Sequence, residues 1–113
     1  MTELTDKKCL PCEGGVNPLN RADAGALMAQ LHEDWTLNAE ATAISRRFKF
    51  KDYYRTMAFV NAVAWIANAE DHHPDMEVGW GACTVHYATH ALSGLSENDF
   101  ICAAKIDVLV GGD

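Results

Sequence analysis

The chain has 113 residues, and its 9 Lys and Arg against 16 Asp and Glu leave a formal net charge of −7. With 49% hydrophobic residues, it has the composition of one small globular domain rather than of a disordered tail. The acidic balance disfavours nucleic acid and anionic membranes as partners, because both select clustered Lys and Arg, and no apolar run approaches the ~20 residues that cross a bilayer.

The first twenty residues are rich in proline, glycine and asparagine and show no hydrophobic periodicity, so residues 1–20 are predicted to form an extended leader. The remaining residues, 21–113, are predicted to form a single domain without internal repeats. The N-terminus carries no apolar signal segment. We therefore expect a cytoplasmic protein whose cysteines are reduced thiols.

Cys9 and Cys12 form a C-x-x-C motif in this leader. A redox pair of this kind normally lies at the start of a helix that follows a strand, and a zinc site needs a second pair of ligands. Cys83 and Cys102 are not paired in the sequence. We interpret the motif as structurally incidental or weakly metal-binding. A small zinc protein that combines these cysteines with histidines stays open as an alternative.

A helix is predicted from about Arg21, with Asn20 as its N-cap, because apolar residues then recur at intervals of three and four. Alternation from Trp35 onward indicates a short strand, and alternation over residues 44–51 indicates a longer, half-buried strand. A turn over residues 38–41 would join the two strands into a hairpin.

The strongest helical pattern is Tyr53–Glu70, with Asp52 as its N-cap and Pro74 bringing it to an end. A second hairpin is predicted to follow, with strands over residues 77–80 and 82–90. The sequence thus alternates helices with pairs of short strands.

The residues Ser96-Glu97-Asn98-Asp99 resemble a capping box that opens a final helix. The element order is therefore α-β-β-α-β-β-α. Two hairpins flanked by helices predict an α+β fold in which helices pack on one face of a four-stranded antiparallel sheet.

The segment Glu70-Asp71-His72-His73-Pro74 lies at the expected C-terminus of the long helix. The negative end of the helix dipole and the two carboxylates favour protonated imidazole at His72 and His73. A histidine that is partly protonated near neutral pH is suited to general acid catalysis. Because neighbouring side chains of extended backbone point to opposite faces, the two histidines are expected to have different roles. A polar helix end with exposed rings is the plain structural alternative.

His86 and His90 are four residues apart on a predicted strand, which separates them by ~13 Å and prevents them from holding one metal ion. His90 ends the strand, a favourable place for a functional side chain, whereas His86 is expected to be an ordinary surface or packed residue. Asp99, the third residue after a Ser96 N-cap, would stabilise the helix start by ~0.5–1 kcal/mol. Trp35 has the plain interpretation of a core residue.

One ordered set of residues goes beyond these separate interpretations. It consists of His72-His73-Pro74, the aromatic Trp80, Thr89-His90 and Gly94-Leu95-Ser96-x-x-Asp99. This constellation resembles the pterin-4a-carbinolamine dehydratases. Bacterial members look similar in further places, which are Cys9-x-x-Cys12, Trp35, Phe48-Lys49-Phe50-Lys51-Asp52-Tyr53 and Asn98-Asp99-Phe100-Ile101.

The resemblance implies an antiparallel four-stranded sheet with helices on one side, assembled as a homodimer or homotetramer. It also implies an enzyme, a hydro-lyase that removes water from 4a-hydroxytetrahydropterin and yields quinonoid dihydropterin. Such a reaction needs proton transfer, for which imidazole is suited, and no metal or redox cofactor. It regenerates the tetrahydrobiopterin used by aromatic amino-acid hydroxylases, so a functional link to such a hydroxylase is implied.

Carried over residue by residue, the resemblance assigns acid/base roles to His72 and His90. His73 completes the catalytic set and is implied mainly to hold the substrate. Asp99 is implied to support the site. The residues implied to bind substrate are Trp35, His72, His73, Pro74, Thr89, His90, Ala91 and Asp99.

One position departs from the pattern of the family. The residue four positions before the first histidine is usually acidic, and here it is Asn68. Glu70 points to a different side of the helix. If the missing carboxylate normally tunes the histidine, the departure predicts a less basic His72.

A second hypothesis belongs to a different class of function. Animal members of the family that this chain resembles also act as dimerisation cofactors of a transcription factor, through a helix that pairs with a partner helix. The alternative function is therefore an interaction module that binds a transcription regulator. Its acidic charge would limit it to protein contacts.

Overall fold

The computed structural model describes residues 3–10 and 17–111. Its elements in chain order are the 3-10 turn η1 (Leu4–Asp6), α1 (Arg21–Met28), β1 (Thr36–Leu37), β2 (Ile44–Lys49), α2 (Tyr53–Glu70), β3 (Asp75–Val78), β4 (Ala82–Tyr87), the 3-10 turn η2 (His90–Leu92) and α3 (Glu97–Gly111). Apart from the two 3-10 turns, this is the predicted order of helices and strands. The α+β fold is confirmed.

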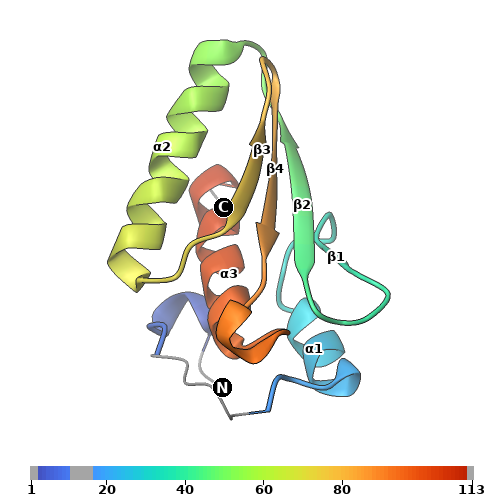
Figure 1. Ribbon diagram of the computed structural model, residues 1–113. Helices are drawn as coiled ribbons and strands as arrows, with labels where there is room; N and C mark the ends of the chain where they lie inside the picture. The colour runs from blue at the N-terminus through green and yellow to red at the C-terminus, as the bar shows by residue number, and fades with distance from the viewer. Residues whose placement is uncertain (1–2, 11–16, 112–113) are drawn as a thin grey trace.

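The four strands form one antiparallel sheet in the order β1-β2-β4-β3. Both predicted hairpins are present, and they join where β2 pairs with β4 along its whole length, with Phe48 opposite Cys83. Figure 1 shows α2 and α3 alongside the same face of this sheet. The segment of Thr89 and His90 therefore follows the central strand β4, whereas His72 and His73 precede the edge strand β3.

The second hairpin, predicted over residues 77–80 and 82–90, has different outer ends. β3 starts at Asp75, because its antiparallel register with β4 continues that far. β4 ends at Tyr87, since the chain then turns out of the sheet and Thr89 forms an isolated bridge. Both changes affect the segments that carry the predicted site.

α2 begins and ends through local backbone contacts. The carboxylate of Asp52 caps its first turn by accepting the N–H of Arg55 at 2.8 Å, as predicted. Asp71 ends the helix in the left-handed conformation, with φ of 52°, and its N–H and that of the following residue return to carbonyls of the last turn. Pro74 lies three residues farther on, so the left-handed cap ends the helix before the proline can.

The core lies between the sheet and the helices. The inward side chains of the two central strands are buried, namely Ile44, Phe48, Cys83, Val85 and Tyr87. α3 is buried over most of its length and contributes Phe100, Ile101, Cys102, Ala103 and Ile106. Each large apolar side chain that is fully buried stabilises the fold by about 1.5–3 kcal/mol. This packing holds the end of β4 and the start of α3 in fixed relation.

The described parts of the leader pack against the domain. Leu4 is buried in the core, and the turn Leu4–Asp6 that carries it is a 3-10 helix rather than the predicted extended chain. Burial of the Leu4 side chain in the core holds this turn against the domain. Farther along, the N–H of Leu19 donates to the carbonyl of Leu95 at 2.8 Å.

α1 begins where the sequence predicts. The side-chain oxygen of Asn20 accepts the N–H of Asp23 at 2.8 Å, which satisfies a free donor of the first turn. Across the described part of the chain, no helix combines the length and apolar character that a membrane crossing needs.

Candidate active site

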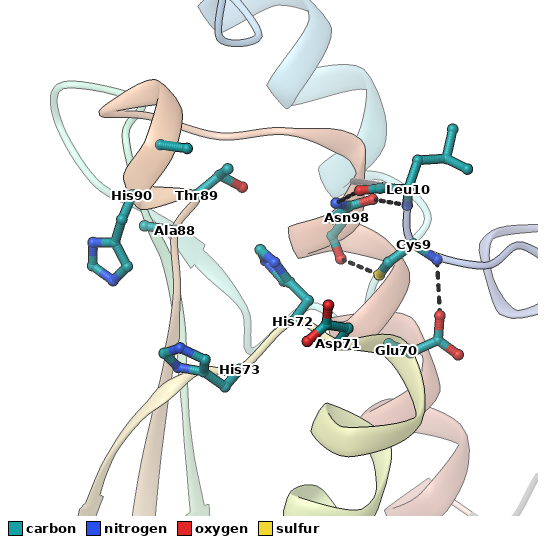
Figure 2. Close-up of a pocket in the computed structure, with 11 residues that line it drawn as sticks. Cys9, Leu10, Glu70, Asp71, His72, His73, Ala88, Thr89, His90 and Asn98 are labelled. Atoms are coloured by element: carbon teal, nitrogen blue, oxygen red, sulfur yellow. Dashed lines mark hydrogen bonds between the residues drawn. The ribbon is translucent and has the colours of Figure 1, made fainter. Parts of the chain in front are cut away.

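A cavity of about 400 Å³ opens where the end of α2, the segment from β4 to η2, the start of α3 and the leader meet (Figure 2). This volume is typical of a small-molecule site. The cavity is lined by Cys9, Leu10, Glu70, Asp71, His72, His73, Ala88, Thr89, His90, Ala91 and Asn98. The three histidines that the sequence singled out therefore line one cavity.

The end of α2 brings His72 and His73 to this cavity. The left-handed Asp71 turns the chain out of the helix and into extended backbone, where neighbouring side chains point to opposite sides. His72 is half-buried, whereas His73 is exposed. The two rings therefore have different surroundings, as the sequence predicts.

Asp99 lies behind His72 and is 0% exposed. Its carboxylate lies 2.6 Å from Nε2 of His72, and it accepts hydrogen bonds from Oγ1 of Thr89 at 2.8 Å and from the N–H of Ser96 at 3.0 Å. Because an ionised carboxylate only accepts, Nε2 of His72 carries a proton. The contact with Ser96 is the predicted cap of α3. The same carboxylate therefore starts the helix and holds the histidine.

The charge state of His72 follows from this contact. Burial by itself would lower the pKa of His72, but the hydrogen bond and the negative charge of Asp99 outweigh it and raise the pKa above its ordinary value. Asp71 adds to the rise. The sequence pointed to Glu70 and Asp71 together as the source of this effect. The carboxylate of Glu70 is instead paired with Lys105 at 2.6 Å.

Asn68, where the family usually has an acidic residue, lies exposed on α2 and does not line the cavity. His72 is nevertheless more basic than an ordinary histidine, because Asp99 supplies a carboxylate from α3. The conditional prediction compares His72 with relatives that carry the acidic residue, and it stays a prediction.

The ring of His72 is held in one orientation. It stacks on Tyr87 with the ring centroids 5.8 Å apart and the planes 8° from parallel. Nε2 is committed to Asp99, and Nδ1 has no hydrogen-bond partner among the residues that the structure describes. Nδ1 is thus the nitrogen left for a ligand.

The segment after β4 positions His90. Thr89 is buried and donates its N–H to the carbonyl of Gly94 at 2.7 Å, which closes a tight loop around η2. A Cβ on Gly94 would lie 2.8 Å from Cβ of Pro18, so the close approach of the leader requires glycine here. His90 begins η2 with an exposed side chain.

Three residues that the resemblance assigns to substrate binding, Trp35, Pro74 and Asp99, do not line the cavity. Trp35 is 3% exposed in the core, where its indole N–H donates to Asp107 at 2.7 Å. It lies behind Tyr87, with ring centroids 6.5 Å apart, and Tyr87 in turn stacks on His72. Pro74 is half-buried and follows the lining residues. Trp35 thus packs against Tyr87 from outside the cavity.

His86 and Trp80 lie elsewhere. His86 is on the outer face of the sheet, with Nδ1 2.6 Å from Oγ of Ser45 and Nε2 2.5 Å from Glu77. The prediction of an ordinary surface or packed residue fits this position. Trp80 is exposed in the turn between β3 and β4.

The leader forms a wall that the sequence did not predict. The side-chain amide of Asn98 makes two hydrogen bonds with the backbone of Leu10, of 3.0 and 2.6 Å, and the N–H of Cys9 donates to Glu70 at 2.8 Å. Burial would raise the pKa of Glu70, but Lys105 and the N–H of Cys9 outweigh it and lower the pKa. The C-x-x-C motif marked this segment in the sequence, but it did not indicate the contacts of the leader with Glu70 and Asn98.

Within residues 3–10 and 17–111, no three His, Cys, Asp or Glu side chains converge as a metal site requires. Cys12 lies outside the described residues. The zinc alternative therefore stays a prediction. The described cavity instead offers imidazoles in different surroundings, which suits proton donation and acceptance.

The chain is similar in sequence to the proteins of one family. Residues 17–109 match the family described as Pterin 4 alpha carbinolamine dehydratase. A protein of Nitrosomonas eutropha that is named pterin-4-alpha-carbinolamine dehydratase is 60% identical over 108 residues, which cover 96% of this chain and 94% of that protein. A protein of the same name from Legionella pneumophila is 53% identical and covers 96% of both chains.

Solved structures agree with this. A transcriptional coactivator/pterin dehydratase from Brucella melitensis is similar with a TM-score of 0.78 and 30% identity, over 84% of this chain and 100% of that one. A pterin dehydratase-like protein, identified as a RuBisCO assembly factor in the alpha-carboxysome, has a TM-score of 0.61 and 26% identity, over 71% of this chain and 93% of that one. The chain therefore belongs to the pterin-4a-carbinolamine dehydratase family of hydro-lyases.

Proposed function

We propose that the cavity binds a 4a-hydroxytetrahydropterin and that the protein catalyses its dehydration to quinonoid dihydropterin. One observation carries the proposal: His72, His73 and His90 line one cavity, and the buried carboxylate of Asp99 holds His72. Membership of the family supports the substrate class.

The reaction is a balanced exchange of protons. The C4a–O bond breaks and the electron pair of N5 forms a double bond to C4a. Since hydroxide is a poor leaving group, the departing oxygen takes a proton and leaves as water, while the proton on N5 goes to a base. One acid loses a proton and one base gains one, so two imidazoles suffice.

We assign the acid to His72 and the base to His90. The raised pKa of His72 keeps a larger share of its rings protonated near neutral pH, and Nδ1 is available to donate. When Nδ1 gives up its proton, the Nε2–H bond to Asp99 preserves the orientation of the ring. His90 lies on the other side of the cavity in Figure 2, where it would meet N5.

The remaining residues hold the substrate. A pterin ring is flat and carries both N–H donors and a carbonyl acceptor, which the backbone of His90 and Ala91 can match, since the N–H and carbonyl of Thr89 are bonded within the loop. His73, exposed beside His72, anchors the ring. Asp99 acts through His72 as a positioning residue.

The test is a stopped-flow assay with freshly generated 4a-hydroxytetrahydropterin. The variants His72→Ala and His90→Ala are expected to lose about 10²–10⁴-fold in kcat, the usual contribution of a general acid or base. His86→Ala is the matched control, because its ring lies on the outer face of the sheet. A wild-type rate equal to that of buffer would refute the activity, and cavity variants as fast as wild type would refute the assignment.

We further propose that the protein works in the cytoplasm in tetrahydrobiopterin recycling, next to an aromatic amino-acid hydroxylase. Such a hydroxylase releases the 4a-hydroxy compound that this reaction consumes. Adding the protein to a hydroxylase assay is expected to shorten the lifetime of that compound. An unchanged lifetime would contradict the link.

A second candidate function is protein interaction, as a homodimer or homotetramer and as a partner of a transcription regulator. Tyr54 and Trp65 on α2 are 84% and 76% exposed. They are eleven residues apart, close to three helical turns, so both lie on the same side of the helix. Exposed aromatic side chains on one side of a helix suit contact with another protein chain. The similar Brucella protein is named a transcriptional coactivator as well as a pterin dehydratase.

Light scattering coupled to size exclusion tests this candidate. Wild type is expected to be a dimer or tetramer, and Trp65→Glu is expected to be smaller while it keeps its fold. Val108→Glu changes a residue that is also exposed, on α3, and serves as the control. A monomeric wild type would contradict the oligomer, and a Trp65→Glu variant of unchanged size would contradict the role of α2.

A further inference from the structure

Two thiols meet where the leader crosses α3. Sγ of Cys9 and Sγ of Cys102 are 3.5 Å apart, although the residues are 93 positions apart in the chain. Cys102 is 0% exposed, whereas Cys9 is half-buried and lines the cavity. Their sulfurs also contact backbone carbonyls, of Asn98 at 3.6 Å and of His72 at 3.8 Å. The contact therefore lies next to the candidate active site.

The leader is attached on both sides of this contact. The N–H of Cys9 is bound to Glu70, and the backbone of Leu10 is bound twice by Asn98, as Figure 2 shows. These bonds keep the half-buried thiol against the buried one. A disulfide bond is about 2.05 Å long, so closing it needs an approach of about 1.5 Å from the observed contact.

We propose that Cys9 and Cys102 are a reversible modification site, a dithiol that low-molecular-weight disulfides convert into a disulfide joining the leader to α3. The proposal rests on the geometry of the two thiols and stands whether or not the cavity binds a pterin. It differs from the C-x-x-C interpretation, because the partner of Cys9 comes from the last helix.

The electrostatics of the pair favour this chemistry. The hydrogen bond from Cys9 lowers the pKa of Cys102, with a further contribution from the charge of His72. The same bond and burial raise the pKa of Cys9. When Cys102 loses its proton, a hydrogen bond from the Cys9 thiol stabilises the resulting thiolate. A thiolate next to a thiol is the arrangement that starts thiol–disulfide exchange.

The exchange balances in two steps. Cys9, at the cavity, attacks one sulfur of the small disulfide RSSR, and the proton of Cys9 passes to the Cys102 thiolate. A Cys9–SR bond forms, the RS–SR bond breaks and RS⁻ leaves. RS⁻ then takes the proton from Cys102, and the Cys102 thiolate attacks the Cys9 sulfur, forming the Cys9–Cys102 bond and releasing a second RS⁻. The small disulfide is reduced, and the two protein thiols are oxidised.

Oxidation would also act on His72. The negative charge of Cys102 contributes to the raised pKa of His72, and a disulfide carries no such charge. The pKa of His72 is therefore expected to fall when the disulfide forms. Any effect of this fall on catalysis rests on the proposed function, because His72 is the acid assigned there.

The experiment uses the full chain with Cys12→Ser, which leaves three cysteines. The protein is equilibrated with glutathione and glutathione disulfide at several ratios, alkylated, and digested with trypsin and Glu-C. Cleavage then separates Cys9 on residues 9–13, Cys83 on residues 78–97 and Cys102 on residues 98–105. Mass spectrometry identifies which fragments are linked.

We expect two of the three thiols to be lost together, with residues 9–13 linked to residues 98–105 and the link reversed by dithiothreitol. In a further Cys102→Ser variant, Cys9 should stop at the mixed disulfide with glutathione. If that buried substitution prevents folding, Cys9→Ser decides instead, and Cys102 should then stay unlinked at every ratio. Cys83, buried on β4, is the internal control and should stay a thiol.

The proposal is overturned if Cys9 is found only as a mixed disulfide while Cys102 is fully alkylated. A Cys83 link that competes with the Cys102 link would also overturn it. None of these readouts uses a pterin, so failure here is distinct from failure of the dehydratase proposal. An NMR titration of His72 in both redox states measures the expected fall in its pKa.

Discussion

Replacing Asp99 with asparagine keeps the shape of the side chain and removes its charge. In the wild type this buried carboxylate faces three donors, Nε2 of His72, Oγ1 of Thr89 and the N–H of Ser96. An amide has one oxygen to accept these bonds and an NH₂ group that meets the remaining donor. His72 therefore loses the partner that holds its proton on Nε2.

The size of the effect follows from these contacts. A hydrogen bond to a charged group contributes about 1.5–3 kcal/mol, and we expect the variant to lose that much stability. Because His72 is then no longer held as a protonated acid, kcat is expected to fall by about 10²–10⁴-fold, the contribution of a general acid. The pKa of His72 should fall as well, since Asp99 is what outweighs burial.

The pH dependence has a definite sign. The pKa of His72 is raised in the folded protein, so its contribution to stability is fully present below the ordinary histidine value of about 6.5 and is lost as the pH rises through the folded pKa. Asp99→Asn should therefore lower the free energy of unfolding more near pH ~6 than near pH ~9.

Three measurements on one variant check these expectations: stopped-flow dehydration against pH, urea unfolding at the two pH values, and an NMR titration of the His72 ring. Glu77→Gln is the matched control. Glu77 lies 2.5 Å from Nε2 of His86 on the outer face of the sheet, so the same change is made at a carboxylate–imidazole pair outside the cavity. It should leave the rate and the pH profile unchanged.

An Asp99→Asn variant that keeps the wild-type rate and an unchanged His72 titration would refute the role given to this carboxylate. A loss of rate without a change in the titration would show that Asp99 acts only by holding α3 and the segment of Thr89. Equal losses in Asp99→Asn and Glu77→Gln would point to a general effect on the fold.

Three further changes test other parts of the structure. The pKa of Glu70 is lowered by Lys105, so their ion pair stabilises the fold above the ordinary carboxyl pKa, and this stabilisation is lost as the pH falls through the folded pKa. Glu70→Gln should therefore lower the free energy of unfolding by about 1.5–3 kcal/mol at neutral pH and by little in acid. Equal losses in urea unfolding at both pH values would contradict this. Gly94→Ala places a Cβ 2.8 Å from Pro18 and should cost about 1–3 kcal/mol, seen as a lower Tm; an unchanged Tm would mean that the leader yields. Trp35→Phe removes the buried indole N–H bond, so it should lower the free energy of unfolding and leave KM for the pterin unchanged, and a raised KM would return Trp35 to the binding site.

Elements that depend on neighbouring residues could be predicted from the sequence. The caps Asn20 and Asp52 were identified because a helix start is decided by a side chain and the N–H groups within one turn of it. The capping role of Asp99 followed in the same way. The end of α2 was less predictable, because the left-handed turn at Asp71 is not a glycine and carries no strong local signal.

Strand ends were less accurate for the opposite reason. How far β3 and β4 extend is set by register with a neighbouring strand, and the alternating pattern of one strand does not contain that register. Thr89 leaves the sheet because Gly94 offers it a partner, a contact across a loop rather than within a strand.

The sequence by itself determined the α+β order, the family resemblance and the three histidines at element ends, because periodicity, caps and motif spacing are properties of residues close together in the chain. Only the tertiary structure decided that Asp99, 27 positions from His72, is the carboxylate that tunes it. It also removed Trp35 from the cavity and brought Cys9 to Cys102. Electrostatic and thiol contacts depend on distances of a few ångströms in space, and separation along the chain does not report them.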